Sequence, residues 1–242
     1  MPAIVDREAA LARLLDANTS GELASGSTGR GFRCRGHWPR VCGGITSLLR
    51  QCFKAGVRRE IRVIRLPRAD MRMMVSNRRT GVRVHRSVSA AFDRAAPRAP
   101  PTDTFARVCV QAAREFAASR HLITVGTELV VVHDRFPLAT RIDALFRDTT
   151  SDELVLVSWK TGVGARNECE FHRHRMQLAF EWHALATTHR IRIARAYLVY
   201  LGGVLVPRSR DAVAVFGEHV VTRTDARELY AEFDKKLAKR FA

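Results

Sequence analysis

An aspartate and a lysine stand in two neighbouring stretches of strand-like sequence. Asp143 lies in the segment RIDALF, and Lys160 closes the segment LVLVSWK after a polar turn. Side chains alternate along a strand, so Ser158 and Lys160 share a face and an acid on the adjacent strand can meet them. Phosphodiester hydrolysis uses such a pair, because a carboxylate holds the cation that activates water and a lysine offsets developing charge. These residues therefore predict a metal-dependent hydrolytic site.

The hydrophobic period predicts the elements that must position this pair. Residues 80–95 and 105–120 repeat apolar side chains at the three-to-four-residue spacing of amphipathic helices. Beyond residue 121 the period falls to two, which predicts a three-stranded meander followed by a helix, two strands and a final helix. The corresponding ranges are 124–134, 136–146, 154–160, 174–186, 194–203, 213–221 and 222–241. We expect an α/β fold with a mixed central sheet flanked by helices, in αβββαβ order.

The N-terminal part of the chain has a different composition. Residues 6–17 suit a short helix capped by Asp6, but the stretch that follows is rich in Gly, Ser and Thr. We therefore expect residues 1–35 to form a flexible arm and residues 36–242 to form a single domain. A helix is also predicted from Gly44 onward.

The charge of the chain is strongly positive. Lys and Arg total 41 against 24 Asp and Glu, a net charge of +17, and only five of the basic residues are lysine. Such an excess favours a polyanion as partner, although a GC-rich coding sequence also enriches arginine. An RNA-binding or ribosome-associated protein is a further interpretation of the charge. No apolar run reaches the ~20 residues that span a bilayer, so we expect no membrane partner.

The cysteine pattern favours reduced thiols. The chain has five cysteines, an odd number, with no CxxC pair, which indicates an intracellular, reducing compartment. Cys34, His37, Cys42 and Cys52 form a weaker alternative as a zinc site, because zinc knuckles usually have closer pairs.

Five short motifs follow one another in a recognisable order. They are GVRVH, TELVVV, RIDALF, LVLVSWKTG and QLAFE, all between residues 81 and 201. In order and spacing they resemble the PD-(D/E)XK nuclease superfamily, within it the RecB-type exonuclease branch that includes the mitochondrial genome maintenance exonuclease and CRISPR-associated and viral relatives. The resemblance implies a restriction-endonuclease-like core.

The resemblance also implies roles for individual residues. His85 would be a metal ligand, Asp143 the principal metal carboxylate, Lys160 the catalytic lysine, and Gln177 a residue that orients the lysine or a phosphate. A lone histidine is otherwise more often a satisfied core or surface residue. The supporting positions are Glu128, at a commonly acidic strand position, and Thr161 and Gly162, in the turn after the strand.

Two positions depart from the family pattern. Ser158 replaces the acid two residues before the lysine, and Glu181 replaces an aromatic residue on the following helix. A serine hydroxyl is a weak ligand for a hard cation. Gln177 and Glu181 are four residues apart and share a helix face, so the carboxylate has a second route to the site, as in some restriction endonucleases of this superfamily. The hypothesis is that His85, Asp143 and Glu181 hold the metal, with Ser158 acting at most through water; the alternative is an exposed Glu181 paired with arginine.

Two basic stretches could hold a phosphate backbone, or could simply be solvated charge. The stretch SNRRTGVR leads into the helix with His85, and HRHR precedes Gln177. The expected DNA-binding residues are Arg78, Arg79, Arg83, Arg166, Arg173 and Arg175.

Together these features predict a Mg²⁺- or Mn²⁺-dependent deoxyribonuclease. We expect an exonuclease or an enzyme that processes single strands or ends, in DNA replication, recombination or repair, with proteins of those pathways as possible partners. No iron–sulfur cluster is expected, because no cysteine follows Cys169. The alternative is a catalytically impaired nuclease fold that binds DNA without cutting it, since Ser158 has replaced the family acid.

Overall fold

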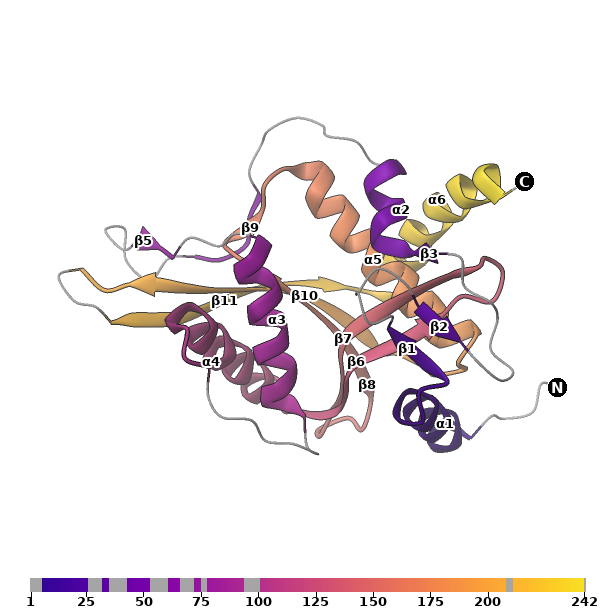
Figure 1. Ribbon diagram of the computed structural model, residues 1–242, viewed down its shortest axis with the longest axis horizontal. Coiled ribbons are helices and arrows are strands. Elements are labelled where there is room, and N and C mark those ends of the chain that lie inside the picture. The colour runs from indigo at the N-terminus through magenta and orange to yellow at the C-terminus, as the bar shows by residue number, and fades with distance from the viewer. Residues whose placement is uncertain are drawn as a thin grey trace.

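A mixed seven-stranded sheet lies at the centre of the described part of the protein (Figure 1). The computed structural model describes residues 6–25, 32–34, 43–52, 61–65, 72–74, 78–93, 101–207 and 211–241. The strands of the sheet are β3 (Gly43–Gly44), β5 (Arg72–Met73), β6 (Leu122–Val132), β7 (Leu138–Asp148), β8 (Leu154–Thr161), β10 (Arg195–Leu205) and β11 (Ala212–Val221). Their order is β11-β10-β8-β7-β3, with β6 also pairing with β7 and β5 with β10.

The remaining elements surround this sheet. Small two-stranded pairs join β1 (Leu23–Ser25) to β2 (Phe32–Cys34) and β4 (Ile61–Arg62) to β9 (Gly164–Ala165). The helices are α1 (Arg7–Thr19), α2 (Ile45–Cys52), α3 (Arg78–Phe92), α4 (Thr104–Ser119), α5 (Glu168–Thr187) and α6 (Arg223–Phe241). No helix in the described residues is both long enough and apolar enough to cross a bilayer.

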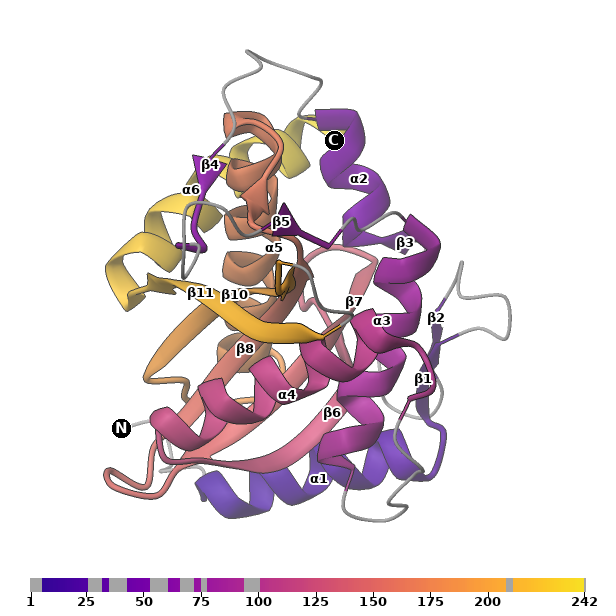
Figure 2. The same cartoon turned by 90° about the vertical axis from the view of Figure 1, so that its left-hand side faces the viewer.

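The strands β8 and β10 are buried on both faces, which explains their nearly continuous apolar sequence. Along β8, Val155, Val157 and Trp159 pack with α3 and α4, whereas Leu154 and Leu156 belong to the cluster that contains α5 and α6. Figure 2 shows α3 and α4 crossing one side of the sheet. Helices therefore cover both faces, and side chains from α3 and from α5 approach β7 and β8 from different directions.

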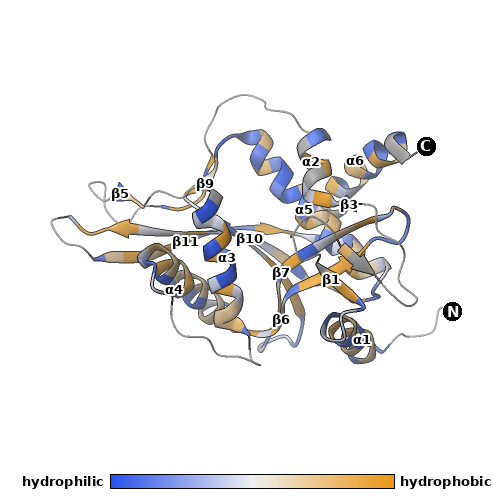
Figure 3. Cartoon of the chain, in the orientation of Figure 1, coloured by the Kyte–Doolittle hydropathy of each residue, from blue (hydrophilic) through white to orange (hydrophobic). Residues whose placement is uncertain are grey.

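The meander that carries Asp143 and Lys160 agrees with the sequence. β6 pairs antiparallel with β7 and β7 with β8, and the chain then crosses through α5 to β10, which lies parallel to β8. The predicted helices and strands after residue 78 are all confirmed, including the buried stripe of Leu178, Trp182 and Leu185 on α5. In Figure 3 the first turns of α5 are hydrophilic, unlike this later part.

The N-terminal helix is packed, which differs from the loosely attached arm expected from composition. Asp6 caps α1 as predicted by accepting a hydrogen bond from the Glu8 backbone N–H. Leu11 and Leu14 are buried, and the Asn18 side chain bonds both the N–H and the carbonyl of Val130 on β6. Composition missed this attachment because it depends on contacts with a strand more than a hundred residues away. Residues 1–5, 26–31 and 35–42 lie outside the described residues, as do two positions of the weak zinc tetrad.

Candidate metal centre

Asp143 lies where two strands of the sheet separate. The ladder between β7 and β8 runs from Arg147 opposite Leu154 to Ala144 opposite Val157, and stops there. At the next position a side chain replaces the backbone contact between the strands. The Asp143 Oδ2 accepts hydrogen bonds from the Trp159 backbone N–H (2.9 Å) and from Ser158 Oγ (3.0 Å). The fork in the sheet therefore fixes the carboxylate while leaving its other oxygen available.

Lys160 is tied to this aspartate through a serine. Its Nζ donates to Ser158 Oγ (2.9 Å), and the same hydroxyl donates to Asp143. Ser158 is only 2% exposed, and it joins the partly buried Asp143 and Lys160 on one face of β7 and β8, as strand alternation predicts. Lys160 also lines a cavity of about 220 Å³ together with Arg173, His174 and Gln177 of α5. Gly162 follows in the left-handed region, at φ +113°, where a glycine suits the expected turn.

His85 reaches the other oxygen of Asp143 from the opposite face of the sheet. Val84 and Val88 bury one side of α3 against β8. This packing brings His85 Nδ1 to 3.3 Å from Asp143 Oδ1. The helix with the GVRVH motif thus delivers an imidazole to the position where the strands fork.

Glu128 completes a group of three possible metal ligands. Ligand atoms of His85, Glu128 and Asp143 all lie within 4.8 Å of one another. The register of β6 and β7 has Thr127 opposite Ala144 and Leu129 opposite Ile142, so Glu128 faces Asp143 across the hairpin. The backbone of Glu128 is left-handed, at φ +55°, which is strained for a residue with a side chain and costs on the order of 1 kcal/mol. A strained residue within a strand is a frequent mark of a functional position.

The carboxylate of Glu128 is held on both sides. Oε1 accepts a hydrogen bond from Ser89 Oγ of α3 (2.9 Å), and Oε2 lies 2.6 Å from Arg141 Nε of β7. Sequence reasoning gave Glu128 only a supporting role. The register of the hairpin between β6 and β7 would have identified Glu128 as a candidate ligand. The turn determines that register, and sequence alone does not fix it.

The two carboxylates of this group have opposite pKa shifts. Burial tends to raise the pKa of Asp143, but His85, Lys160 and the Ser158 hydroxyl outweigh it and hold that pKa well below its usual range. The pKa of Glu128 is raised, first by burial and then by the negative charge of Asp143. Two carboxylates thus lie close enough for the charge of Asp143 to raise the pKa of Glu128, and a cation bound between them would favour the ionised form of both.

Glu181 is buried beside the site and is not exposed on the helix surface, so the alternative of an exposed, arginine-paired carboxylate is wrong. It is 1% exposed, and its Oε1 accepts from Gln177 Nε2 (2.8 Å) and Thr140 Oγ1 (3.2 Å). Burial, together with Asp143, raises the pKa of Glu181 to about 8. Its Oε2 is buried without a hydrogen-bond partner in the part of the chain that the structure describes. Glu181 is not a member of the three-ligand group, so Glu128 occupies the place that the hypothesis gave to Glu181.

The residues present fit a hard divalent cation. Two carboxylates and an imidazole are ligands that Mg²⁺ and Mn²⁺ accept, with Mn²⁺ more tolerant of nitrogen. The unpartnered Oε2 of Glu181 is a further oxygen that lacks a donor or cation. Ser158 Oγ already contacts Lys160 and Asp143, which leaves it suited to a water-mediated contribution at most.

The arginines expected to bind DNA do not form one group. Arg173 lines the cavity beside Lys160, and Arg79 and Arg166 are exposed. Arg175 lies 3.6 Å from Asp225 of α6, and Arg83 lies 3.3 Å from Asp103. The side chain of Arg78 is outside the described residues. Of this set, the structure therefore brings only Arg173 to the same cavity as Lys160.

Comparison of the sequence with models of known protein families gives no match, and comparison with curated proteins gives none either.

Proposed function

We propose that the chain is a metal-dependent deoxyribonuclease with a restriction-endonuclease-like core of the PD-(D/E)XK, RecB type. The observation that carries the proposal is the convergence of His85, Glu128 and Asp143 within 4.8 Å, with Lys160 linked to Asp143 through Ser158. The antiparallel meander, the crossover through α5 and the parallel pairing of β8 with β10 support the same core. Four of the five sequence motifs lie in these elements, and the fifth, GVRVH, lies in α3.

His85, Glu128 and Asp143 hold the metal in this proposal, and Glu181 approaches from α5. A bound Mg²⁺ or Mn²⁺ supplies Lewis acidity toward a phosphate oxygen and lowers the pKa of water. Asp143 remains ionised and is therefore always ready to bind a cation. Burial and Asp143 raise the pKa of Glu181 to about 8, and a cation held nearby would lower that pKa and favour the ionised carboxylate, with the proton passing to water.

Lys160 positions the nucleophile and offsets charge that develops on the scissile phosphate. Ser158 fixes its ammonium group, and the adjacent cavity opens toward Arg173 and Gln177. A fixed cation is more effective than a mobile one because no reorganisation is needed during the reaction. Gln177 is a positioning residue here, since its amide donates to Glu181 and so orients that carboxylate.

The substrate in this proposal is DNA with free ends or single strands, acted on in replication, recombination or repair. The net charge of +17 supports a polyanion as substrate. The cavity beside Lys160, of about 220 Å³, has room for one phosphate group with part of its sugar.

End-labelled single-stranded and duplex DNA, incubated with Mg²⁺ or Mn²⁺, tests the proposal. Cleavage is expected with the parent protein, should stop on addition of EDTA, and should fall at least about a hundredfold in Asp143→Asn, because a lost ligand costs no less than a lost outer contact. Glu115→Gln is the matched control, since it neutralises a carboxylate on the exposed side of α4. Equal cleavage by Asp143→Asn and Glu115→Gln contradicts the proposal.

A DNA-binding protein without turnover is the second candidate, and Ser158 favours it. The Ser158 hydroxyl is committed to Lys160 and Asp143 where the family has an acid. DNA binding without cleavage, together with cleavage gained in Ser158→Asp, supports this second candidate. Cleavage by the parent excludes it.

A further inference from the structure

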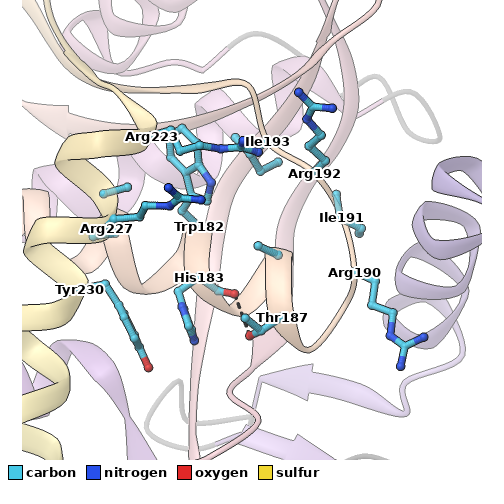
Figure 4. Close-up of a pocket in the computed structure, with 13 residues that line it drawn as sticks. Trp182, His183, Thr187, Arg190, Ile191, Arg192, Ile193, Arg223, Arg227 and Tyr230 are labelled. Carbon is cyan, nitrogen blue, oxygen red and sulfur yellow. Dashed lines mark hydrogen bonds between the residues drawn. The ribbon is translucent and has the colours of Figure 1, made fainter. Parts of the chain in front are cut away.

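A larger cavity lies on the other side of α5, away from Asp143. It has a volume of about 880 Å³ and is bounded by the second half of α5, the connection 190–193 and the first turns of α6 (Figure 4). On α5 its walls are Ala179, Trp182, His183 and Ala186, whose spacing places them on one helix face. Glu181, which is buried against Thr140 of β7, does not line it. The cavity is therefore separate from the candidate metal centre.

The floor of this cavity is apolar and its rim is cationic. Trp182, Ile191, Ile193 and Tyr230 line it and are each no more than 9% exposed. Figure 4 shows Arg223 and Arg227 beside Trp182, with Arg190 and Arg192 on the connecting segment across from them. The four rim arginines are all exposed.

These four arginines differ from others nearby in having no acidic partner. Arg135 pairs with Asp234 and Arg195 pairs with Asp148, so the surrounding surface does neutralise guanidinium groups where acids are available. No ion pair joins any of the four rim arginines to an acid in the described residues. Four uncompensated charges around an apolar floor create a strong local attraction for an anion that also has an apolar part.

One end of the cavity is lined by a fixed aromatic pair. The rings of His183 and Tyr230 are stacked, with centroids 3.6 Å apart and planes inclined by 6°. His183 Nε2 is buried and lies 4.0 Å from Asp134 Oδ1. The Thr187 hydroxyl donates to the His183 carbonyl. This end of the cavity therefore presents a flat aromatic surface, on which a planar apolar group can pack.

The nearby cluster of His133, Asp134 and His183 does not offer a metal site instead. Nδ1 of His133 accepts hydrogen bonds from the backbone N–H groups of Arg135 and Phe136, and its Nε2 contacts the Tyr230 hydroxyl. Both ring nitrogens of His133 are thus in use. His133 therefore supports the aromatic wall of the cavity and does not present a lone pair to a cation.

We infer that this cavity binds a nucleoside phosphate, with the base on the apolar floor and the phosphate at the arginine rim. Its volume falls in the range of about 300–1,000 Å³ that holds small organic ligands, and is far larger than an inorganic anion needs. Guanidinium groups bind phosphate oxygens through paired hydrogen bonds. An acidic peptide fits less well, because each of its residues brings an amide that the apolar floor cannot pair.

The nucleoside phosphate has two possible sources, a free nucleotide or one unit of a nucleic-acid strand. ATP, deoxythymidine monophosphate and a fluorescein-labelled 12-nucleotide single strand serve as separate probes, and inorganic phosphate and hexaglutamate serve as comparisons. Binding is measured in EDTA by calorimetry or fluorescence anisotropy, so that no cleavage occurs. The tested variant is Arg223→Ala/Arg227→Ala. Its control, Arg107→Ala/Arg114→Ala, removes the same charge from exposed positions of α4 on the other side of the sheet.

The rim variant is expected to raise the Kd of a nucleotide probe about tenfold or more relative to the control variant, since two charge-assisted hydrogen bonds are lost. A loss confined to the mononucleotides indicates a free nucleotide, and a loss that includes the oligonucleotide indicates a strand. The inference is overturned if the rim variant and the control variant bind the nucleotide probes with equal affinity. It is also overturned if the rim variant loses as much affinity for hexaglutamate as for the nucleotides, or if the parent protein binds inorganic phosphate as tightly as a nucleotide. Failure to cleave DNA tests the proposed function alone, because these measurements need neither metal nor turnover.

Discussion

The two sides of α5 differ in how they handle charge. On the side of Asp143, hydrogen bonds hold two neighbouring groups, one around Asp143 and Lys160 and one around Glu181, and a carboxylate oxygen of Glu181 has no partner among the described residues. On the side of Trp182, arginines that form no ion pair within the described residues surround an apolar floor. Fixed groups of opposite charge suit bond making and breaking, because their positions are set before the reaction begins. An open cationic rim suits binding, because its arginines are free to adapt to a ligand.

Loss of Lys160 is the strongest test of this difference. Lys160→Ala is expected to lower DNA cleavage about 10²–10³-fold, the usual effect of removing one fixed group that stabilises developing charge. Nucleotide binding at the arginine rim should not change, since Lys160 does not line that cavity. Single-turnover cleavage and calorimetry on the same preparation measure both. Parallel loss of cleavage and rim binding contradicts a division of labour between the two sides.

Acid is expected to weaken both regions together through His189. Its Nε2 accepts a hydrogen bond from the Val132 backbone N–H and so anchors the end of α5 to β6. Burial, and to a smaller extent Arg13, lowers the pKa of His189 to about 4. The unfolded chain binds the proton near pH 6.5 and the folded protein only near pH 4, so the stability that neutral His189 contributes is constant above pH 6.5 and is lost as the pH falls between these values.

The size of this loss follows from the pKa difference. It approaches about 3 kcal/mol below pH 4, where the folded protein is protonated as well as the unfolded chain. Urea unfolding at pH 7.5, 6 and 5 measures it, and His189→Gln, which cannot take up a proton, should show a shallower dependence on pH. The same slope in parent and variant removes His189 as the cause.

Two glutamates compete for a ligand role, and metal affinity separates them. Glu128→Gln is expected to weaken Mn²⁺ binding about 10–100-fold, because Glu128 lies within 4.8 Å of both His85 and Asp143. Glu181→Gln should have the smaller effect, since Glu181 reaches the site from outside that group. Calorimetric titration with Mn²⁺ at pH 7 gives both values. A larger loss in Glu181→Gln restores the ligand set expected from sequence.

Sequence was sufficient wherever a local pattern determined the structure. The alternation of LVLVSWK and the helical stripe around Val84 fixed which faces of β8 and α3 are buried, and so predicted that Asp143, Ser158 and Lys160 meet. It failed where long-range contacts decide. Hairpin register and a left-handed backbone bring Glu128 opposite Asp143, and neither has a signature in the sequence around residue 128.

The arginine cavity was invisible to sequence analysis for a similar reason. Its rim comes from the connection after α5 and from α6, and in the sequence these arginines are four among many in a strongly basic chain. What distinguishes them is that all four line one apolar cavity while none forms an ion pair within the described residues. An enrichment of arginine therefore acquires meaning only when the partners of each side chain are known.

The smallest expected effect is on nucleotide affinity, from a substitution that changes the shape of the arginine cavity without changing its charge. Ala186 is exposed at the wall of the arginine cavity, so Ala186→Trp fills part of the cavity without disturbing the buried core. Nucleotide affinity should fall about threefold to tenfold, the usual effect of losing a modest apolar contact. Binding of inorganic phosphate should stay the same, because all four arginines remain. If filling the cavity changes neither affinity, the floor does not contact the base, and the rim acts as an electrostatic surface alone.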